Sequence, residues 1–384
     1  MFLDIGITTD LSLVPNRVTE LAEAGFDGVF TAESNRDVFA PLVLAAEHSD
    51  LYCYTNIALA FPRSPMLLAC TGWDLQNYSR GKMALGLGSQ IKPHIQKRYS
   101  ATWERPVKQM REVIESIKAI FKCWSEGSEL NYQGDFYKFS LMTPIFVPDS
   151  MPWEPPPVWL AALGPMMTKL AGELSDGVLI HPFSSRKFLD EVTIPALTDG
   201  ADKAGRINKP KLITNSIVCS YRSDEEYEKA IKGAKFNLAF YGSTPAYKVT
   251  LDVHGWGDMQ PVLNRLTKEG RWEEISSVIT DEVLHTLAVV GEPSEVGSQL
   301  VERFGDIADR VGLSVPYDAP VDLLADVVSH VKLNSSKKPS GRTFIPRLSD
   351  DKTLTVKTSP TFKPFSLKKS IGLFLHCLIP PLTL

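Results

Sequence analysis

The sequence has few of the features that mark disulfide-bonded, metal-bound or membrane-spanning proteins. Its five cysteines form no Cys-x-x-Cys pair and are odd in number, which argues against a disulfide framework and a zinc site and predicts reduced thiols that fill the core. The seven histidines show neither His-x-x-x-His nor His-x-His spacing, so we expect no bound metal. No run of about 18 apolar residues occurs, so we expect no membrane-spanning helix.

Charge is unevenly distributed along the 384 residues. The segment Ser335–Leu384 carries nine Lys and Arg against two Asp and Glu, a net +7, whereas the residues before it carry 32 against 43, a net −11. An acidic body argues against a nucleic-acid groove, so we expect no nucleic-acid partner. The first residues, MFLDIGITTD, lack the basic and apolar regions of a signal peptide and predict a strand. Together with the reduced cysteines, they predict a cytoplasmic protein.

Short apolar runs typical of strands alternate with helical patterns along most of the chain. Eight such units in roughly 330 residues predict a parallel sheet and favour a closed (β/α)8 TIM barrel over a doubly wound sheet. The predicted strands are Phe2–Thr8, Gly28–Ala32, Tyr52–Ala60, Met83–Leu87, Val158–Ala162, Gly177–His181, Leu212–Ser220 and Asp309–Ser314. The predicted helices are Leu13–Ala24, Phe39–Glu47, Met66–Tyr78, Pro106–Trp124, Met166–Leu174, Ser185–Ala204, Glu225–Leu238 and Pro320–Val331.

Two segments exceed a minimal barrel. Glu126–Pro157, before strand five, contains NYQGDFYKF, which predicts a β-hairpin, and then a proline-rich run. Thr244–Val290, between strands seven and eight, predicts several inserted helices. Long excursions of this kind usually cover the active-site face of a barrel.

The chain divides by composition into a barrel domain, residues 1–334, and a basic tail, residues 335–384. The tail is rich in Ser, Thr, Lys and Pro without clear periodicity, which predicts disorder. It ends in SIGLFLHCLIPPLTL, which is too short to span a bilayer. Three interpretations of this end stay open: an anchor, a docking peptide, or a non-native extension.

The stretch Gly81–Arg111 is the most informative part of the chain. A buried strand is followed by a turn, Gly88-Ser89-Gln90, and a polar loop that contains His94. Ligands of α/β folds bind at loops that leave the C-terminal ends of parallel strands. Glycine lets the backbone approach a flat ring or a phosphate there, while Ser89 and Gln90 supply polar groups. The alternative is a tight turn that binds nothing.

Two further positions predict ligand contacts at strand ends. Gly164-Pro165 opens a helix, and the N-terminus of a helix is an anion site. His181 ends the sixth strand, where a barrel residue is more often functional than one in mid-strand. The alternatives are an ordinary helix start and a structural histidine that caps its loop.

With these pieces assembled, the chain resembles the luciferase-like monooxygenase superfamily, and within it the branch that uses the deazaflavin F420. The resemblance runs from about Met1 to Lys332 and includes the predicted (β/α)8 fold. Four segments carry it: AEAGFDGVFTAES, TNIALAFPRSPMLLA, GKMALGLGSQIKPHIQKRYSATWERPVKQMRE and PPPVWLAALGPMMTKLAGELSDGVLIHPF. The third is the most specific, and the order and spacing of all four make the case.

The resemblance implies a cofactor site across several strand ends. The implied cofactor-binding residues are Asn56, Ile57, Ala58, Ser89, Gln90, Ile91, His94, Leu163, Gly164, Pro165, Met166, Met167 and His181. In such proteins the residues from Leu163 to Met167 hold phosphate through backbone N–H groups, and His181 hydrogen-bonds the cofactor. Several F420-dependent members carry a cis non-proline peptide in strand three, so we expect one near Asn56-Ile57-Ala58.

The same resemblance gives candidates for catalysis without assigning the general acid or base. Glu33 matches an acidic residue of relatives. Ser34 and Ile91 stand where the sugar-phosphate dehydrogenases of the family have histidine and glutamate, which argues against a sugar-phosphate substrate. The candidates for proton transfer are Glu33, His94, His181 and Tyr247. Tyr247, like His254, belongs to the inserted segment and has packing as its alternative role.

The function implied is an F420-dependent oxidoreductase that moves a hydride between C5 of the deazaflavin and a small organic substrate. The alternative is an FMN-dependent monooxygenase supplied with reduced flavin by a separate reductase, and a third reading is a non-catalytic flavin-binding relative. Lys92, Lys97, Arg98 and Arg63 are available for the acidic tail of F420, with plain solvated surface charge as the alternative. Homodimers are common in the family, and the sequence does not name the substrate.

Overall fold

The computed structural model describes residues 1–7 and 10–335. Eight parallel strands form a closed ring in which β1 (Phe2–Gly6) lies between β2 (Gly28–Thr31) and β12 (Arg310–Ser314). The ring continues through β3 (Tyr52–Thr55) and is closed between β9 and β10. The remaining barrel strands are β5 (Met83–Gly88), β8 (Val158–Ala161), β9 (Gly177–Ile180) and β10 (Lys211–Ser220). The predicted (β/α)8 barrel is therefore confirmed.

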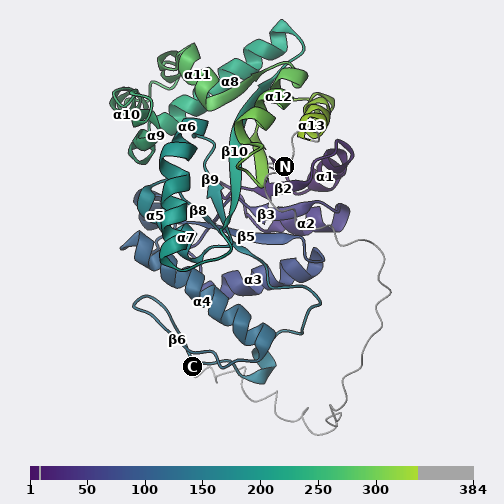
Figure 1. Cartoon of the computed structure of the whole chain (residues 1–384), viewed down its shortest axis with the longest axis vertical. Helices are drawn as coiled ribbons and strands as arrows, with labels where there is room; N and C mark the ends of the chain where they lie inside the picture. The colour runs from purple at the N-terminus through teal and green to yellow at the C-terminus, as the bar shows by residue number, and fades with distance from the viewer. Residues whose placement is uncertain (8–9, 336–384) are drawn as a thin grey trace, which may run out of the picture. The chain divides into compact units, whose positions relative to one another are not determined.

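Helices surround this ring, as Figure 1 shows. They alternate with the barrel strands in sequence, and their buried residues pack on the outside of the sheet. The helices that flank the barrel are α1 (Val14–Glu23), α2 (Ala40–His48), α3 (Pro65–Tyr78), α4 (Pro106–Glu126), α5 (Pro165–Leu174), α6 (Arg186–Phe188), α7 (Ile194–Lys203), α8 (Asp224–Gly242), α12 (Pro293–Phe304) and α13 (Val321–Ser335). A π-helical turn, Leu189–Thr193, joins α6 to α7.

The interior of the barrel is filled, not hollow. Its middle layer consists of Phe30, Tyr54, Ala84, Trp159, Leu179 and Ile213. Towards the N-terminal ends of the strands, the Nε and Nη2 atoms of Arg310 donate to the two oxygens of Asp4 at 2.7 and 2.5 Å. The hydroxyl of Tyr54 donates to the same carboxylate at 3.1 Å. A packed interior leaves the chemistry to the loops at the other end.

The third strand differs from its prediction. The sequence predicts one strand from Tyr52 to Ala60, but the structure divides it into β3 and a short β4 (Ala58–Leu59). Tyr54 pairs with Ala84 of β5, whereas Ala58 pairs with Leu87, so the third strand has one residue more than β5 over this stretch. This is a β-bulge, and an uninterrupted apolar run in the sequence gives no sign of it.

The two excursions are also resolved into elements. NYQGDFYKF forms the predicted hairpin from β6 (Tyr132–Gln133) and β7 (Lys138–Phe139). The inserted segment between β10 and β12 contains η4 (Pro245–Tyr247), α9 (Lys248–Asp252), α10 (Met259–Lys268), η5 (Ile275–Val278) and α11 (Asp281–Leu287). The several helices predicted here are present, whereas the strand β11 (Ala288–Gly291), which pairs with the C-terminal half of β10, was not predicted. Figure 1 shows α9, α10 and α11 grouped at the upper left.

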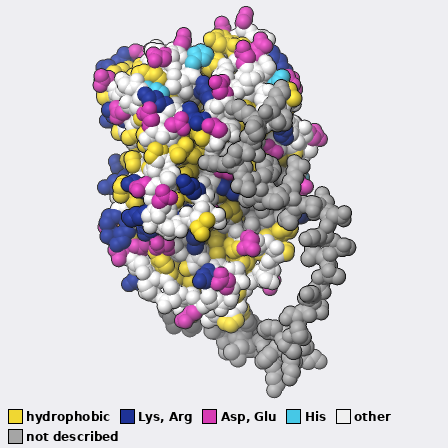
Figure 2. Space-filling model, in the orientation of Figure 1, with side chains coloured by type: hydrophobic (Ala, Val, Ile, Leu, Met, Phe, Trp, Pro, Cys, Tyr) yellow, Lys and Arg dark blue, Asp and Glu magenta, His cyan; other side chains and the backbone are white. Residues whose placement is uncertain are grey.

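Charged side chains of both signs are interspersed on the face of the molecule shown in Figure 2. Many charged residues of the described chain are paired: Arg222 contacts Asp322 and Asp326 at 2.6 Å each, and Arg186 contacts Asp306 at 2.7 Å. No helix in the described part of the chain is long and apolar enough to cross a membrane. The predicted basic tail lies outside the described residues, apart from its first residue, Ser335.

Candidate functional site

The predicted site residues follow the C-terminal ends of five adjacent strands. The order β2-β3-β5-β8-β9 in the barrel puts the ends of these strands at one edge of the sheet. Glu33 follows β2, Asn56 follows β3, Ser89 follows β5, Gly164 follows β8 and His181 follows β9. Residues that are far apart in the sequence thus meet at the end of the barrel where enzymes of this architecture have their active sites.

The bulge in the third strand carries the expected cis peptide. The bond between Asn56 and Ile57 is cis, which confirms the prediction for this segment. The side chain of Ile57 fills the place that a Cβ atom on Gly88 would occupy, and the carbonyl of Thr55 fills the corresponding place at Gly86. The two glycines of β5 are therefore explained by close packing against the bulge. The suggestion that Gly88 makes room for a ligand is not needed to explain this residue.

A chain of amide hydrogen bonds crosses the barrel interior above the apolar layer. Nδ2 of Asn56 donates to Oδ1 of Asn215 at 3.0 Å, and Nδ2 of Asn215 donates to the carbonyl of Ile180 at 2.8 Å. Asn215 lies in β10 and is only 4% exposed. It thus connects the bulge to the residue that precedes His181. The sequence reasoning missed Asn215, although a polar residue between inward-facing Ile213 and Ile217 was a usable signal.

Glu33 is bonded on both carboxylate oxygens. Oε2 accepts from the backbone N–H of Leu59 at 2.8 Å and from Nη1 of Arg63 at 2.7 Å. Oε1 accepts from the hydroxyl of Tyr99 at 3.2 Å. The side chain of Glu33 is only 5% exposed. Its bonds connect the loops that follow β2, β4 and β5 at the C-terminal end of the barrel. Arg63 is consequently engaged inside the protein and is a poor candidate for a rim cation. A catalytic role for Glu33 stays a prediction.

His181 is half-buried, and its hydrogen bond defines its tautomer. Nδ1 accepts from the backbone N–H of Phe183 at 3.1 Å, so the proton of the neutral ring is placed on Nε2. Burial lowers the pKa of this imidazole from 6.5 to about 3, so the ring stays neutral at ordinary pH. A neutral imidazole with one N–H group is a hydrogen-bond donor towards a ligand, not a proton reservoir.

The N-terminus of α5 is open. Gly164 is its N-cap and provides no side chain to bond the first backbone N–H groups, and the first turn holds no acidic residue. Apart from its chain neighbours, no described residue has an atom within 4 Å of the place where a Cβ atom on Gly164 would be. Because Pro165 has no N–H group, the donors available here are those of Met166 and Met167. These features fit a phosphate group, which helix N-termini bind through free N–H groups and the helix dipole.

The loop after β5 is partly self-bonded. Oε1 of Gln90 accepts from the N–H of Ile91 at 3.0 Å, and the carbonyl of Gln90 accepts from Nε1 of Trp103 at 3.4 Å. Gln90 has a φ of 54°, in the left-handed region, which turns the chain away from the strand. His94 begins a π-helical turn, His94–Arg98, and is exposed. The cofactor contacts expected of Ser89, Gln90, Ile91 and His94 stay predictions.

The inserted segment is fixed to the loop that follows His181. His254 contacts Oγ of Ser185 through Nε2 at 2.8 Å, and Oγ1 of Thr250 donates to the carbonyl of Phe183 at 3.2 Å. His254 also stacks on Trp256 with ring centroids 4.5 Å apart. His254 therefore packs within the inserted segment and against Ser185, which is the alternative role considered for it. Tyr247, in contrast, lies against His181.

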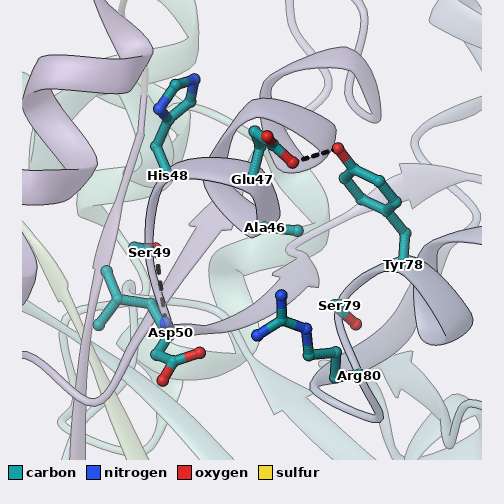
Figure 3. A pocket seen from close by; sticks show the side chains of 9 residues that line it. Ala46, Glu47, His48, Ser49, Asp50, Tyr78, Ser79 and Arg80 are labelled. Carbon is teal, nitrogen blue, oxygen red and sulfur yellow. Dashed lines mark hydrogen bonds between the residues drawn. The ribbon is translucent and has the colours of Figure 1, made fainter.

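A polar pocket lies at the opposite end of the barrel. It has a volume of about 460 Å³ and is lined by residues that end α2 and α3 and precede β3 and β5 (Figure 3). The hydroxyl of Tyr78 donates to Glu47 at its edge, and the side chain of Arg80 points into it. Because it lies at the N-terminal ends of the strands, whereas Gly164 and His181 follow the C-terminal ends, we do not assign it as the cofactor site.

No group of three or more His, Cys, Asp or Glu side chains within residues 1–7 and 10–335 could hold a metal ion. The site therefore consists of amides, a neutral imidazole, a helix N-terminus and small residues around strand ends. This set suits an organic ligand that carries a phosphate and polar ring atoms.

Fold and site together define a TIM-barrel protein whose ligand site is built on the C-terminal ends of its strands. A comparison with known families matches residues 7–310 to the luciferase-like monooxygenases. The chain belongs to the luciferase-like monooxygenase family.

Among relatives, the chain is 43% identical over 311 residues to an uncharacterized protein of Mycobacterium tuberculosis, covering 80% of this chain and 92% of the relative. It is 28% identical over 344 residues to a 5,10-methylenetetrahydromethanopterin reductase of Archaeoglobus fulgidus, covering 86% and 94%. Relatives that carry a functional name include oxidoreductases, and so the family membership supports an enzyme.

Solved structures with the same fold include proteins of both cofactor classes. The F420-dependent tetrahydromethanopterin reductase from Methanopyrus kandleri superposes with a TM-score of 0.71 at 19% identity, covering 87% of this chain and 99% of that one. EDTA monooxygenase from Chelativorans sp. BNC1 gives 0.66 at 16% identity, covering 88% and 93%. At these identities the likeness shows the fold alone.

Proposed function

We propose that this chain is an F420-dependent oxidoreductase that transfers a hydride between the deazaflavin and a small organic substrate. The observation that carries the proposal is the open N-terminus of α5 beside the strand-end loops that resemble those of F420-dependent enzymes. The similarity to a methylenetetrahydromethanopterin reductase supports it, because F420-dependent tetrahydromethanopterin reductase has the same fold.

Each part of the proposed site has a physical task. The N–H groups of Met166 and Met167 bind the phosphate, and the Nε2–H group of His181 donates to a cofactor or substrate acceptor. Ile57 and the bulge form an apolar floor next to β5, braced by the Asn56–Asn215 bond. When bound, the deazaflavin supplies hydride transfer at C5. The inserted segment screens the reacting groups from water.

Three cations on the loop after β5 favour F420 over FMN. F420 has an acidic oligoglutamate tail, and Lys92, Lys97 and Arg98 are exposed at this end of the barrel. The second candidate function is an FMN-dependent monooxygenase that receives reduced flavin from a separate reductase. The shared fold with EDTA monooxygenase supports it, since a phosphate site at α5 serves either cofactor.

Titration of the purified full-length protein with F420 and with FMN, followed by fluorescence quenching, tests the proposal. We expect micromolar or tighter binding of F420 and weaker binding of FMN. A matched control is Arg80→Ala, which changes the remote pocket and is expected to leave both affinities unchanged. The opposite preference makes the chain a flavin monooxygenase, to be followed by oxygen uptake with reduced FMN. Binding of neither cofactor would mean that the phosphate site at Gly164 to Met167 is wrong or that the barrel has lost its cofactor.

A further inference from the structure

Two tyrosines of the chain segment beyond β10 contact the ring of His181 on adjoining sides, and their own ring centroids are 6.3 Å apart. The ring centroid of Tyr241, near the end of α8, is 4.5 Å from that of His181 at an interplanar angle of 80°. The ring centroid of Tyr247, in η4, is also 4.5 Å away, at 38°. Both tyrosines also contact Phe183, at 6.3 and 6.2 Å. His181 is thus the meeting point of β9 and the start of the inserted segment.

The bonding of the two imidazole nitrogens is unequal. Nδ1 accepts from the N–H of Phe183, whereas Nε2 has no hydrogen-bond partner within the part of the chain that the structure describes. Aromatic rings on two sides leave the imidazole little freedom to rotate about its side-chain bonds. One N–H donor is therefore held in a fixed direction at the end of β9.

The tyrosine hydroxyls have different surroundings. Burial raises the pKa of Tyr241, and the side chain of Asn237, one turn earlier in α8, counteracts part of this rise. No hydrogen bond to the hydroxyl of Tyr247 occurs among the described residues. Burial raises the pKa of Tyr247 to about 12, so this phenol stays protonated. The ring contacts and not the hydroxyls are what the two residues share.

The inserted segment holds this arrangement from outside. The bond from Thr250 to the carbonyl of Phe183 and the contact between His254 and Ser185 join it to the residues that follow His181. Nζ of Lys187 donates to the carbonyl of Val253 at 2.8 Å. Any movement of the inserted segment away from the barrel therefore acts on the same loop that supplies the partner of Nδ1.

We propose that Tyr241 and Tyr247 are positioning residues that fix His181 as a neutral donor with its Nε2–H group directed at a ligand acceptor. The acceptor would be an oxygen or ring nitrogen of the cofactor or substrate, and this part rests on the proposed function. The inserted segment thereby contributes to ligand binding through the contact of Tyr247 with His181, in addition to covering the site. The rings carry this role, and the hydroxyl of Tyr247 is dispensable for it.

Selective ¹⁵N labelling of histidine in the full-length protein tests the positioning directly, without a cofactor. His181 signals are assigned by their loss in His181→Gln. In the parent protein and in Tyr247→Phe we expect the Nε2-protonated tautomer and no titration near neutral pH. In Tyr247→Ala we expect mixed tautomers and a His181 pKa that moves upward towards its ordinary value. Should that variant not fold, Tyr247→Leu keeps an apolar side chain and carries the same expectation.

Cofactor affinity is the second readout. Tyr247→Ala and Tyr241→Ala are expected to weaken F420 binding by about tenfold or more, and Tyr247→Phe by less than about twofold. The control is Tyr227→Ala, which removes a half-exposed ring that packs on Tyr221 at 4.9 Å, away from His181. It is expected to leave the affinity and the His181 signals unchanged.

The outcomes separate this proposal from the proposed function. An unchanged His181 spectrum in both alanine variants overturns the positioning role, whatever the cofactor. Loss of turnover in Tyr247→Phe with unchanged binding also overturns it, because the hydroxyl would then be the working group. The expected spectra in a protein that binds neither F420 nor FMN would support the positioning of His181 and contradict only the assigned cofactor.

Discussion

At the scale of single residues, the buried pair Asp4–Arg310 stabilises the barrel near the N-terminal ends of its strands. Asp4 is fully buried, and the guanidinium of Arg310 also lies over the ring of Tyr52 at 4.7 Å. Burial raises the pKa of Asp4, and the bonds from Arg310 and Tyr54 counteract this. The pair joins β1 to β12, the first and the last strand of the barrel, so its loss weakens the contact between these two strands.

Asp4→Asn is therefore expected to lower the free energy of unfolding by about 3–5 kcal/mol, because it leaves the Arg310 cation buried without its counter-charge. Urea unfolding measures this. The control is Asp10→Asn in the exposed pair Asp10–Arg36, whose atoms are 3.0 Å apart, with an expected loss much smaller than that of Asp4→Asn. Equal losses in the two variants would contradict the structural role given to the buried pair.

His181 gives the protein a pH-dependent stability term whose sign follows from its pKa. The unfolded chain binds a proton near pH 6.5, whereas the folded chain does so only near pH 3, so protons favour the unfolded state between these values. The stability is complete above about pH 6.5 and falls as the pH decreases, by at most about 1.4 kcal/mol per pH unit.

Urea unfolding of the parent protein and of His181→Gln at about pH 7.5 and about pH 5 checks this term. The variant cannot titrate here, so the stability of the parent relative to the variant is expected to decrease at the lower pH. His285→Gln, at an exposed position of α11, is the control and should run parallel to the parent. A parent and His181→Gln that run parallel would show that burial does not suppress this protonation.

At the scale of elements, a negative charge at the N-terminus of α5 is expected to stabilise the helix but to weaken the binding of a phosphate there. Gly164 has φ −77° and ψ 153°, a conformation that any N-cap residue adopts. Gly164→Asp is expected to raise the free energy of unfolding by about 0.5–1 kcal/mol through capping and the helix dipole. The same carboxylate occupies and repels the phosphate site, so F420 and FMN affinity should fall by about tenfold or more.

Urea unfolding and fluorescence titration measure the two effects in one sample. Gly164→Ser is the matched control, since it caps the helix without adding a charge and should bind more tightly than Gly164→Asp. If both variants bind as well as the parent, the phosphate does not sit at this helix and the cofactor-binding prediction for Leu163 to Met167 is wrong.

The alternation of short apolar runs with helical patterns was enough to predict the eight strands and their helices. Buried barrel strands require short continuous apolar runs, whereas the helices outside them require apolar residues at helical spacing, so each leaves its own pattern in the sequence. Predicted and observed ends often agree within two residues, as for α4, predicted at Pro106–Trp124 and found at Pro106–Glu126. The sequence did not predict that the bulge after Thr55 interrupts the third strand, because a bulge is defined by the pairing register between this strand and β5. β11 was missed because a four-residue strand has too little pattern to separate from a helix end.

The site was predictable in its position but only partly in its partners. A strand-end residue such as His181 or Gly164 is recognisable from its place after an apolar run. The bonds of Glu33 to Leu59, Arg63 and Tyr99, and those of Asn215, join residues that are distant in sequence, so no local pattern encodes them. The same applies to the contact of Tyr241 with His181.

At the scale of the whole molecule, residues 1–339 form one compact unit. The ring of strands, the inserted segment and α13 all lie within it. A chain that ends at Pro339 is therefore expected to fold and to unfold with the same free energy as the full chain, within about 0.5 kcal/mol. Parallel urea unfolding and F420 titration of both lengths measure this, and a lower stability or affinity of the shorter chain would assign a role to residues 340–384.

The closure of the ring also has a consequence for synthesis on the ribosome. β1 is bonded on one side to β2, but its other neighbour is β12, which begins more than 300 residues later. At translation rates of about 5–20 residues per second, the open edge of β1 waits on the order of 15–60 s for its partner. An unpaired strand edge is a site of misassociation between nascent chains. Slower elongation late in the message should therefore lower the yield of native protein, whereas chaperones that cover the edge of β1 should restore it.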